Sequence, residues 1–315
     1  MEETRLERIR RNVEKHGIPG RDLYELPTSD KRFPDRCHYR IEISGVERPS
    51  TLEALVDEMD KRDVPVHRLI SMVMGATYLS DDELESFAKM ARDAKLEVVA
   101  TPGPRALWDL GAQIRTPEGA LSGLRYRGSD NLSYVIGDIV RAAEFGIRGF
   151  LVVDEGLLWL LSEMRKAGDL PKDLVFKVSI FAGHANAAGA RVLEMLGANT
   201  FNPVADLTLP MLASIRKAVD IPIDVHVVIF DSYGGINRIW ETPEITRVCA
   251  PCYYKIEPGT SAGALYKPYS SPEHLAFLAR EKVKMAEVII SLIEKNYPEA
   301  KLSKIGPSDL AVPKP

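Results

Sequence analysis

The sequence predicts a single (β/α)8 barrel, and three observations support this fold class. Apolar or β-branched runs of about five to eight residues alternate along the chain with helical stretches of about ten to fifteen. There are eight such runs, which is the number of strands in the barrel. The chain has 315 residues and 45% hydrophobic side chains, enough for one large core. An open doubly wound sheet is the alternative, because a strand count from one sequence has an error of about one strand.

The expected strands cover residues 38–44, 66–74, 96–102, 149–154, 174–181, 199–204, 221–229 and 252–258. Six expected helices lie between them, several with Ser, Asp, Asn or Thr just before the periodic part and Gly or Asp at the end. These helices cover residues 50–63, 80–94, 131–146, 155–168, 186–197 and 208–219. An amphipathic N-terminal helix within residues 1–17 and a long final helix at 271–296 complete the prediction.

One domain is expected over residues 1–300, and two segments fall outside the barrel pattern. Residues 102–131 are long for a connection between a strand and a helix, and they contain a hairpin-type turn at "TPEG". We therefore expect a rim or lid element there, in which Arg105, Arg125 and Arg127 attract an anion. The last residues, 301–315, have the composition of a tail.

Charge and cysteine content limit the class of protein. The formal net charge is −4 and the pI is about 6.0, so nucleic acid and an anionic membrane are not expected partners. The N-terminus is charged from its second residue, unlike a secretory signal, and no run approaches the length of a membrane span. Cys37, Cys249 and Cys252 are too few for a disulfide framework. We therefore expect a cytoplasmic protein with reduced thiols; its oligomeric state stays open, a homo-oligomer being one expectation.

Polar side chains alternate with apolar ones on four of the expected strands. Side chains two positions apart share a face of a strand, and the apolar face of a barrel strand meets the helices. The polar set that then faces inward is Arg40, Glu42, Ser44, Lys177, Ser179, Asp224, His226, Lys255 and Glu257. Charge inside a barrel is costly unless it is paired, so this set is either a buried ion-pair network or a functional site. We interpret it as a site in one cavity at the carboxyl ends of the strands.

Further polar residues follow the expected strands, where the catalytic loops of a barrel lie. Asp154 and Glu155 follow the fourth strand, although either residue can instead cap the next helix. His184 lies in "AGHANAAG" after the fifth strand, and Asn202 lies in "NTFNPVADL" after the sixth. Glycine-containing turns after the last two strands, "DSYGGIN" and "EPGTSAG", have a composition typical of an anion-binding loop.

Seven phrases of the sequence together resemble one bacterial family. They are "HYRIEISG", "GSDNLSY", "FLVVDEGLLWLL", "FKVSIFAGHANAAGA", "GANTFNPVADL", "IPIDVHV" and "APCYYKIEPG", and they span residues 38–259. They are similar to proteins of the collagenase-like peptidase U-32 family, which implies a barrel and, by class name, a hydrolase of peptide-like substrates. Some members carry four clustered cysteines for an iron–sulfur centre, whereas this chain has three in two places, so no iron–sulfur cluster is expected. No Ser-His-Asp, Cys-His or H-E-x-x-H arrangement is legible, so the residues themselves give no peptidase mechanism.

Three functional hypotheses stay open beside this resemblance. In the first, a divalent cation, magnesium or manganese before zinc, activates water or polarises a carbonyl. Its ligands would be Glu42, Asp224, His226 and Glu257. In the second, Lys177 or Lys255 forms a Schiff base or removes an α-proton, as lyases and isomerases of this fold do. In the third, the barrel binds a ligand or a protein partner without turnover.

The two lysines differ in their neighbours. Glu257 lies on the same face as Lys255 and would keep it charged, as an anchor for a carboxylate or phosphate. Lys177 has only Ser179 on its own face and is the better nucleophile, provided that no carboxylate from another strand reaches it. The expected catalytic residues are Lys177, His226, Glu42, Glu257 and Asp154. The residues expected to bind a small anionic or peptide-like substrate are Arg40, Lys255, His184, Asn202 and Arg105.

Overall fold

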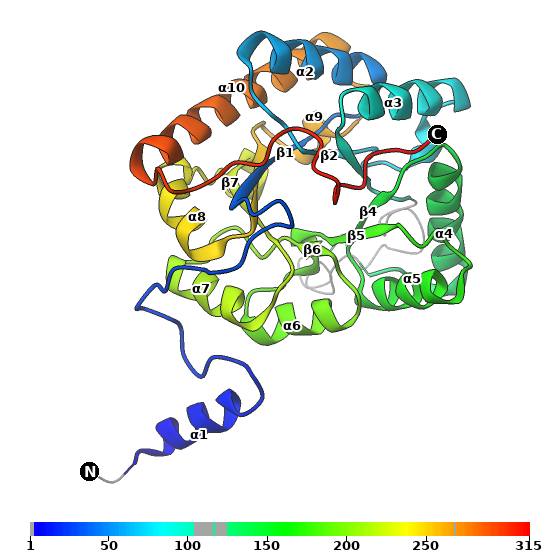
Figure 1. Ribbon diagram of the computed structural model, residues 1–315. Coiled ribbons are helices and arrows are strands. Elements are labelled where there is room, and N and C mark those ends of the chain that lie inside the picture. The colour runs from blue at the N-terminus through cyan, green and yellow to red at the C-terminus, as the bar shows by residue number, and fades with distance from the viewer. Residues whose placement is uncertain (1–2, 104–115, 117–124, 268) are drawn as a thin grey trace.

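The computed structural model describes residues 3–103, 116, 125–267 and 269–315 of the chain. Eight parallel strands close into a barrel in chain order. The last strand pairs back onto the first, with Lys255 opposite Glu42. Helices surround this barrel as an outer ring (Figure 1). The predicted (β/α)8 fold is therefore confirmed.

The strands lie within the predicted runs, and most are shorter than those runs. They are β1 (Tyr39–Ser44), β2 (Arg68–Ser71), β3 (Glu97–Ala100), β4 (Gly149–Val152), β5 (Val175–Val178), β6 (Thr200–Phe201), β7 (Ile223–Ile229) and β8 (Cys252–Glu257). Nearly every strand residue is buried, because helices cover the outside of the barrel and side chains fill its interior.

The helices predicted between the strands are present. They are α2 (Pro49–Arg62), α3 (Asp81–Asp93), α4 (Gly128–Glu144), α5 (Glu155–Ala167), α6 (Ala187–Met195) and α7 (Leu209–Ala218), followed late in the chain by α10 (Pro272–Asn296). The sequence did not predict α8 (Thr242–Cys249) or the single-turn α9 (Ala262–Leu265), because helices this short show little periodicity. The N-terminal helix α1 (Arg5–Glu14) stands apart from the barrel (Figure 1).

Helix starts follow capping residues in the sequence. At α3, Ser80 and Glu83 form a reciprocal capping box. Asn186 accepts a backbone hydrogen bond at the start of α6. Asp154 caps α5, because its Oδ1 accepts a hydrogen bond from Leu157 N at 3.0 Å. This cap is the alternative that the sequence offered to a catalytic role for Asp154.

Apolar side chains pack on both faces of the strands. The larger cluster lies between the barrel and its helices and includes Leu52 and Phe87. A smaller cluster includes Ile70, Val99 and Leu151. Ile70 lies two positions after Arg68 on β2, so this smaller cluster lies on the inward face together with the charged residues. The interior of the barrel is thus part apolar and part charged.

The C-terminal segment, residues 301–315, lies across the amino end of the barrel (Figure 1). Leu302 pairs with Tyr39 of β1, and the Ser303 carbonyl oxygen lies 2.9 Å from His67 Nε2. Near the terminus, Lys314 N donates a 2.9 Å hydrogen bond to a backbone carbonyl. The sequence predicted a tail, because the polar composition gave no sign that backbone hydrogen bonds would attach it. The segment is instead part of the barrel floor.

The predicted rim element falls mostly outside the described residues. Arg105 and most of the "TPEG" turn belong to residues 104–115 and 117–124, whereas Arg125 and Arg127 lie in the described part, just before α4. The lid and the role of Arg105 therefore stay predictions. Among the described helices, none combines the length and the apolar character needed to cross a membrane.

Candidate functional site

The polar residues that alternate along the strands are buried, as expected for side chains inside the barrel. Seven of them are at most 4% exposed: Arg40, Glu42, Lys177, Asp224, His226, Lys255 and Glu257. The prediction that all seven share one cavity at the carboxyl end is wrong, because they divide along the barrel axis. We name the amino-half network (Arg40, Glu42, Arg68, Glu97, Lys177, Thr200, Asp224, Tyr253) and the carboxyl-half group (Ser44, Asn202, His226, Lys255, Glu257).

Lys177 lies at the centre of the amino-half network. Its Nζ donates hydrogen bonds to Asp224 Oδ2 at 2.5 Å and to Glu42 Oε2 at 2.9 Å. Burial lowers the pKa of Lys177, and both carboxylates oppose that shift. The condition set for Lys177 as a nucleophile, that no carboxylate from another strand reaches it, is therefore not met. Because both ion pairs would have to break before attack on a carbonyl, this geometry favours a structural role.

Two members of the network, Arg68 and Glu97, were not among the predicted site residues. Arg68 Nε donates to Glu97 Oε2 at 3.1 Å, and its Nη1 lies 3.3 Å from both Glu42 Oε2 and Asp224 Oδ1. The Arg68 guanidinium also stacks on the Tyr253 ring, 3.7 Å from its centroid. In "LEVVATP" the two-residue alternation signals Glu97, because the opposite face carries only Leu96, Val98 and Ala100. In "VHRLISMVM" Arg68 shares its face with Ile70 and Met72, so the alternation gives no such signal for Arg68. A cavity of about 280 Å³ at the amino end reaches these two side chains.

The pKa values of the two central carboxylates of the network are shifted in opposite directions. Burial opposes ionisation of both groups. For Glu42, the nearby cations, led by Lys177, outweigh burial and hold its pKa below the usual value. For Asp224, burial dominates and raises the pKa, although Lys177 and Arg68 oppose it. Each cation in this half thus faces an acidic partner, which matches the ion-pair alternative offered by the sequence.

Arg40 closes the network at the amino end, which differs from its predicted role in binding substrate. Its Nη1 and Nη2 donate to the two carboxylate oxygens of Asp309, each at 2.8 Å, and its Nε donates to Ser303 Oγ at 2.9 Å. The guanidinium also lies over the Phe33 ring at 3.9 Å. Arg40 lies nearer the amino end of β1 than Glu42 does, and the C-terminal segment covers Arg40. Its guanidinium is therefore far from the carboxyl end of the barrel, where a substrate was expected.

His226 and Glu257 form a buried pair in the carboxyl-half group. His226 Nε2 lies 2.9 Å from Glu257 Oε2. Burial and Lys255 lower the pKa of His226, so its imidazole is neutral near pH 7. Burial opposes ionisation of Glu257, but Lys255 and His226 outweigh it and lower its pKa. An ionised carboxylate accepts the Nε2 proton, which leaves a lone pair on Nδ1 of His226.

Lys255 lies beside this pair without a short contact to it. Its Nζ is 3.9 Å from Glu257 Oε1 and 3.9 Å from Glu42 Oε1. Both distances exceed hydrogen-bond length, so the ammonium keeps donors for another group. His226 and Lys255 face each other in the β7–β8 register. A ligand near His226 is therefore also near the Lys255 ammonium.

Several buried polar atoms around this group have no hydrogen-bond partner in the described part of the chain. They are Glu42 Oε1, Ser44 Oγ, Asn202 Oδ1 and His226 Nδ1. Buried polar atoms are normally paired with protein or water, because leaving one unpaired costs about 1–3 kcal/mol. Four such atoms on β1, β7 and the end of β6 leave hydrogen-bonding capacity in the interior for a ligand or for water.

Lys282 of α10 is a further buried cation that the sequence analysis missed. It is 0% exposed and its Nζ donates to Ser44 O at 2.6 Å. Burial lowers the pKa of Lys282 to about 8, against the opposing effect of Glu257 and Glu47. A lysine on the apolar stripe of an amphipathic helix is the sequence signal that would have revealed it.

The predicted loop residues lie at the carboxyl ends of the strands but have local partners. His184 Nε2 lies 2.7 Å from Glu155 Oε1, and Arg125 Nη2 lies 3.0 Å from Glu155 Oε2. Asn202 Nδ2 donates to the Asp224 carbonyl oxygen at 2.5 Å. Glu155 thus joins two predicted mouth residues, His184 and Arg125, into one partly exposed cluster.

The metal prediction has no matching arrangement in the described residues. In that part of the chain, no three His, Cys, Asp or Glu side chains form a group that could hold a metal ion. Glu42 and Asp224 face Lys177 and Arg68, so cationic side chains already lie where a metal would. The predicted divalent cation stays a prediction.

Comparison with known proteins supports the fold. No protein-family model and no curated protein sequence matches the chain. A protein named as a fructose-1,6-biphosphate aldolase from Coccidioides immitis is 12% identical with a TM-score of 0.50, over 92% of this chain and 95% of that one. The YdjI aldolase from Escherichia coli K12 is 15% identical, TM-score 0.47, over 83% and 94%. The U32 peptidase Mk0906 is 15% identical, TM-score 0.43, over 76% and 98%. At such identities the likeness shows the barrel alone.

Proposed function

We propose that the protein is an enzyme that removes a proton beside a carbonyl group of a small anionic substrate, as lyases and isomerases do. The single observation that carries this proposal is the His226–Glu257 pair with its unpartnered Nδ1 beside Lys255. A general base needs a lone pair at neutral pH, an orienting partner and a nearby charge that stabilises the product. The three side chains supply these three features.

In the proposed reaction His226 Nδ1 takes the proton from the carbon next to the carbonyl. The two electrons of that C–H bond move toward the carbonyl oxygen, which becomes an enolate oxygen. The Lys255 ammonium stabilises this oxygen or the substrate carboxylate. Glu257 holds the imidazole by Nε2 and stabilises the imidazolium that forms. Return of the proton to the opposite face of the same carbon gives an epimerase. Addition of the enolate carbon to an aldehyde forms a carbon–carbon bond, and the former aldehyde oxygen takes the proton held by His226, which is the synthetic direction of an aldol-type lyase.

The unpartnered atoms favour this proposal over a barrel that binds without turnover or serves only as a scaffold. A scaffold would show its interior charges paired off, as the amino-half network does. In the carboxyl-half group, Ser44 Oγ, Asn202 Oδ1 and His226 Nδ1 are buried and find no partner within residues 3–103, 116, 125–267 and 269–315. A lowered pKa beside a specific charge partner is also a feature of catalytic groups.

Hydrolysis is a second candidate, favoured by the resemblance of seven sequence phrases to U-32 peptidases. In that case His226 takes a proton from water instead of from carbon, and Lys255 stabilises the oxyanion on the attacked carbonyl. His226 and Lys255 have the same roles in both candidate reactions. The two candidates differ in which solvent atom enters the product: hydrogen at carbon after proton abstraction, or oxygen after hydrolysis.

The deciding experiment follows both fates at once. The protein is incubated in deuterated, ¹⁸O-labelled water with a panel of small keto acids, aldehyde phosphates and short peptides. Deuterium at the carbon next to the carbonyl, seen by NMR, supports proton abstraction. Labelled oxygen in a cleaved peptide, without deuterium, supports hydrolysis. If neither label enters any substrate, the enzyme proposal fails in favour of a binding protein.

His226→Gln tests the base directly. Loss of a general base costs about 10²- to 10⁴-fold in rate, so deuterium incorporation should fall by that factor while the unfolding transition stays close to wild type. The reaction needs His226 in its unprotonated form. Because the pKa of His226 is lowered, the rate should start to fall only at a pH below the usual pKa of an imidazole. An unchanged rate in His226→Gln would remove the imidazole from the mechanism. His184→Gln, at the partly exposed mouth, is the matched control.

A further inference from the structure

Helix α1 carries an apolar stripe that none of the described residues of its own chain covers. Leu6, Ile9 and Val13 are spaced for one face of a helix and are 54%, 48% and 37% exposed. No residue of α1 is buried in the described structure. A ten-residue helix is marginal in water by itself, even with the capping box of Thr4 and Glu7. The stripe therefore needs a partner surface to stay helical.

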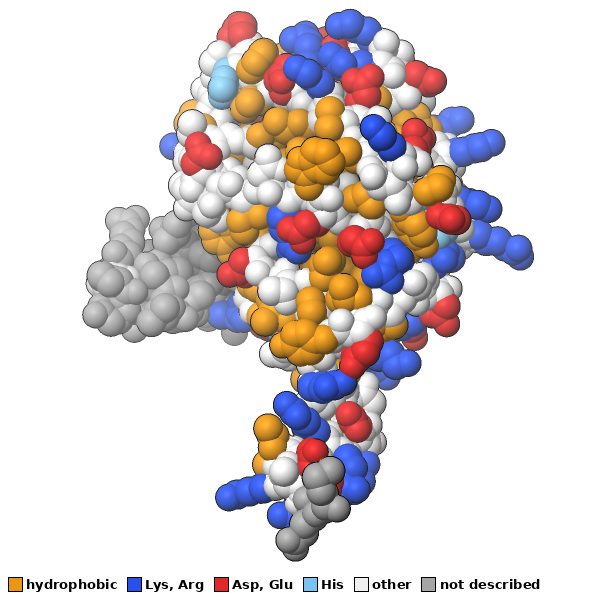
Figure 2. Space-filling model, turned by 90° about the vertical axis from the view of Figure 1, so that its left-hand side faces the viewer, with side chains coloured by type: hydrophobic (Ala, Val, Ile, Leu, Met, Phe, Trp, Pro, Cys, Tyr) orange, Lys and Arg blue, Asp and Glu red, His pale blue; other side chains and the backbone are white. Residues whose placement is uncertain are grey.

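The surroundings of α1 leave it free to meet such a partner. It stands away from the barrel in Figure 1, and Figure 2 shows it below the barrel with basic side chains around it. Residues 23 and 29 anchor the following segment, because Leu23 N donates to Pro210 O and Ser29 N donates to Arg247 O. The free arm thus begins on the α7 and α8 side of the barrel.

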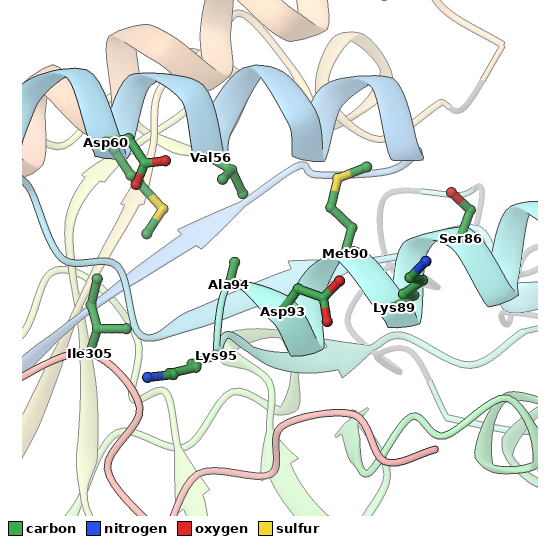
Figure 3. A pocket seen from close by; sticks show the side chains of 10 residues that line it. Val56, Asp60, Ser86, Lys89, Met90, Asp93, Ala94, Lys95 and Ile305 are labelled. Atoms are coloured by element: carbon green, nitrogen blue, oxygen red, sulfur yellow. The ribbon is translucent and has the colours of Figure 1, made fainter.

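A groove of matching character lies on the other side of the barrel, between α2 and α3. Its volume is about 660 Å³, and Figure 3 shows the side chains that line it. The apolar lining residues are Val56, Met59, Met90, Ala94 and Ile305. A neighbouring hollow of about 650 Å³ shares Met59 and Ile305 and extends the groove toward the C-terminal segment. Methionine-lined grooves between helices are typical seats for an amphipathic helix.

The charges of the two surfaces are complementary. The α1 helix carries four arginines against two glutamates. The α2 and α3 helices together carry nine acidic side chains against four basic ones. Asp60 and Asp93 lie on the groove itself beside Lys89 and Lys95, so the excess of acidic charge comes from the rest of α2 and α3 around the groove. The two aspartates can meet arginines that flank the apolar stripe of α1. Two α1 helices facing each other would instead bring arginines together.

From this match we propose that α1 of one copy of the chain seats its Leu6–Ile9–Val13 stripe in the α2–α3 groove of a second copy. A second copy is required because Figure 1 shows α1 and the α2–α3 pair on opposite sides of the barrel, and the anchored segment at residues 23–29 holds the arm there. Each chain then gives an arm to one neighbour and offers a groove to another, which produces a homo-oligomer.

A disulfide test locates the contact. In a Cys37→Ser background, one protein carries Ile9→Cys and a second carries Ala94→Cys; the two are mixed and oxidised under native conditions. The expected result is a crosslinked pair of chains from the mixture. Arg11→Cys, on the opposite face of α1, is the matched control and should give no such product. Equal crosslinking by Arg11→Cys overturns the proposal, as does a bond formed only within a single chain that carries both cysteines.

The oligomeric state tests the same contact without cysteines. The wild-type chain should sediment as a multiple of 35.0 kDa at micromolar concentration, and Leu6→Asp/Ile9→Asp should reduce the mass to one chain. The conservative variant Leu6→Met/Ile9→Val should keep the multiple. Because no residue of α1 is buried against its own barrel, the thermal unfolding midpoint of Leu6→Asp/Ile9→Asp should equal that of the wild type. A wild-type protein that sediments as one chain, or an oligomer unchanged in Leu6→Asp/Ile9→Asp, overturns the proposal.

Discussion

The two halves of the barrel interior are built from the same kinds of residues and differ in how completely those residues are paired. In the amino half, Lys177 contacts two carboxylates and Arg40 contacts both oxygens of Asp309. In the carboxyl half, Lys255 stays 3.9 Å from its carboxylates and His226 keeps an unpartnered Nδ1. Burial is therefore a poor guide to function in this barrel. Unmet hydrogen-bonding capacity is greater in the carboxyl half, where three side chains have an unpaired polar atom among the described residues, than in the amino half, where only Glu42 Oε1 does.

The difference follows from what covers each end. Asp309 and Ser303 belong to the C-terminal segment, which closes the amino end and completes the pairing of Arg40. At the carboxyl end, buried polar atoms of the strands, such as Ser44 Oγ and His226 Nδ1, have no hydrogen-bond partners among the described residues. The first arrangement stabilises the barrel, and the second leaves capacity for a ligand.

The largest expected effect comes from removing the centre of the amino-half network. Lys177→Met leaves Glu42 and Asp224 buried and facing each other, and breaking a buried pair in this way costs about 3–5 kcal/mol. The free energy of unfolding in urea should fall by that amount. A loss under about 1 kcal/mol would contradict a structural role and would return Lys177 to the list of reactive lysines.

The second effect is acid sensitivity of the floor. Burial lowers the pKa of His67 to about 4, and its ring nitrogens contact Ile41 N and Ser303 O. The unfolded chain binds this proton near pH 6.5 and the folded chain does so only near pH 4, so stability falls as the pH drops through that window. The expected loss is about 3 kcal/mol from this group. Urea unfolding at pH 7 and pH 4 measures it.

A variant separates this titration from those of the carboxylates. His67→Gln cannot take up the proton, so its stability should change less than that of the wild type between pH 7 and pH 4. An equal pH dependence in both proteins would assign the acid effect to other groups.

A smaller effect is expected where the C-terminal segment meets Arg40. Asp309→Asn removes the charge from a partner whose side chain is 28% exposed, while Ser303 and Tyr253 stay bonded to Arg40. We expect a loss of about 2 kcal/mol in unfolding free energy, the usual range for hydrogen bonds to a charged group. Protease cleavage after Lys301 or Lys304 should accelerate if the segment loosens. No change in either measurement would show that Asp309 does not hold the floor.

The smallest effect on stability is expected in the carboxyl half. Lys255→Met removes a buried cation whose Nζ lies 3.9 Å from Glu42 and from Glu257, beyond hydrogen-bond distance, so the free energy of unfolding should fall by less than it does in Lys177→Met. Its effect should appear in binding, with KM raised about tenfold for an anionic substrate and a smaller change in kcat. If Lys255→Met destabilises the chain as much as Lys177→Met, the contrast between the two halves does not hold.

The sequence predicted the barrel because strand order and periodicity are local properties. Eight apolar runs and a two-residue alternation sufficed to place Glu42, Lys177, Asp224, His226 and Lys255 on inward faces, and all are buried. The same alternation also signals Glu97, whereas Arg68 shares its strand face with apolar Ile70 and Met72 and gives no such pattern. The helix α8 was missed because eight residues span too few turns to show a period.

What the sequence by itself determined is which side chains point into the barrel, since that depends on the pleat of each strand alone. Only the tertiary structure decided how far along the barrel axis each of these side chains lies and which side chains it contacts. The carboxylates that engage Lys177 come from positions 135 and 47 residues away, and Asp309 reaches Arg40 from 269 residues away. Such pairings depend on the stagger of neighbouring strands and on where the C-terminal segment crosses, and neither leaves a local pattern in the sequence. For that reason the division into a closely paired amino half and an incompletely paired carboxyl half is visible only in the closed barrel.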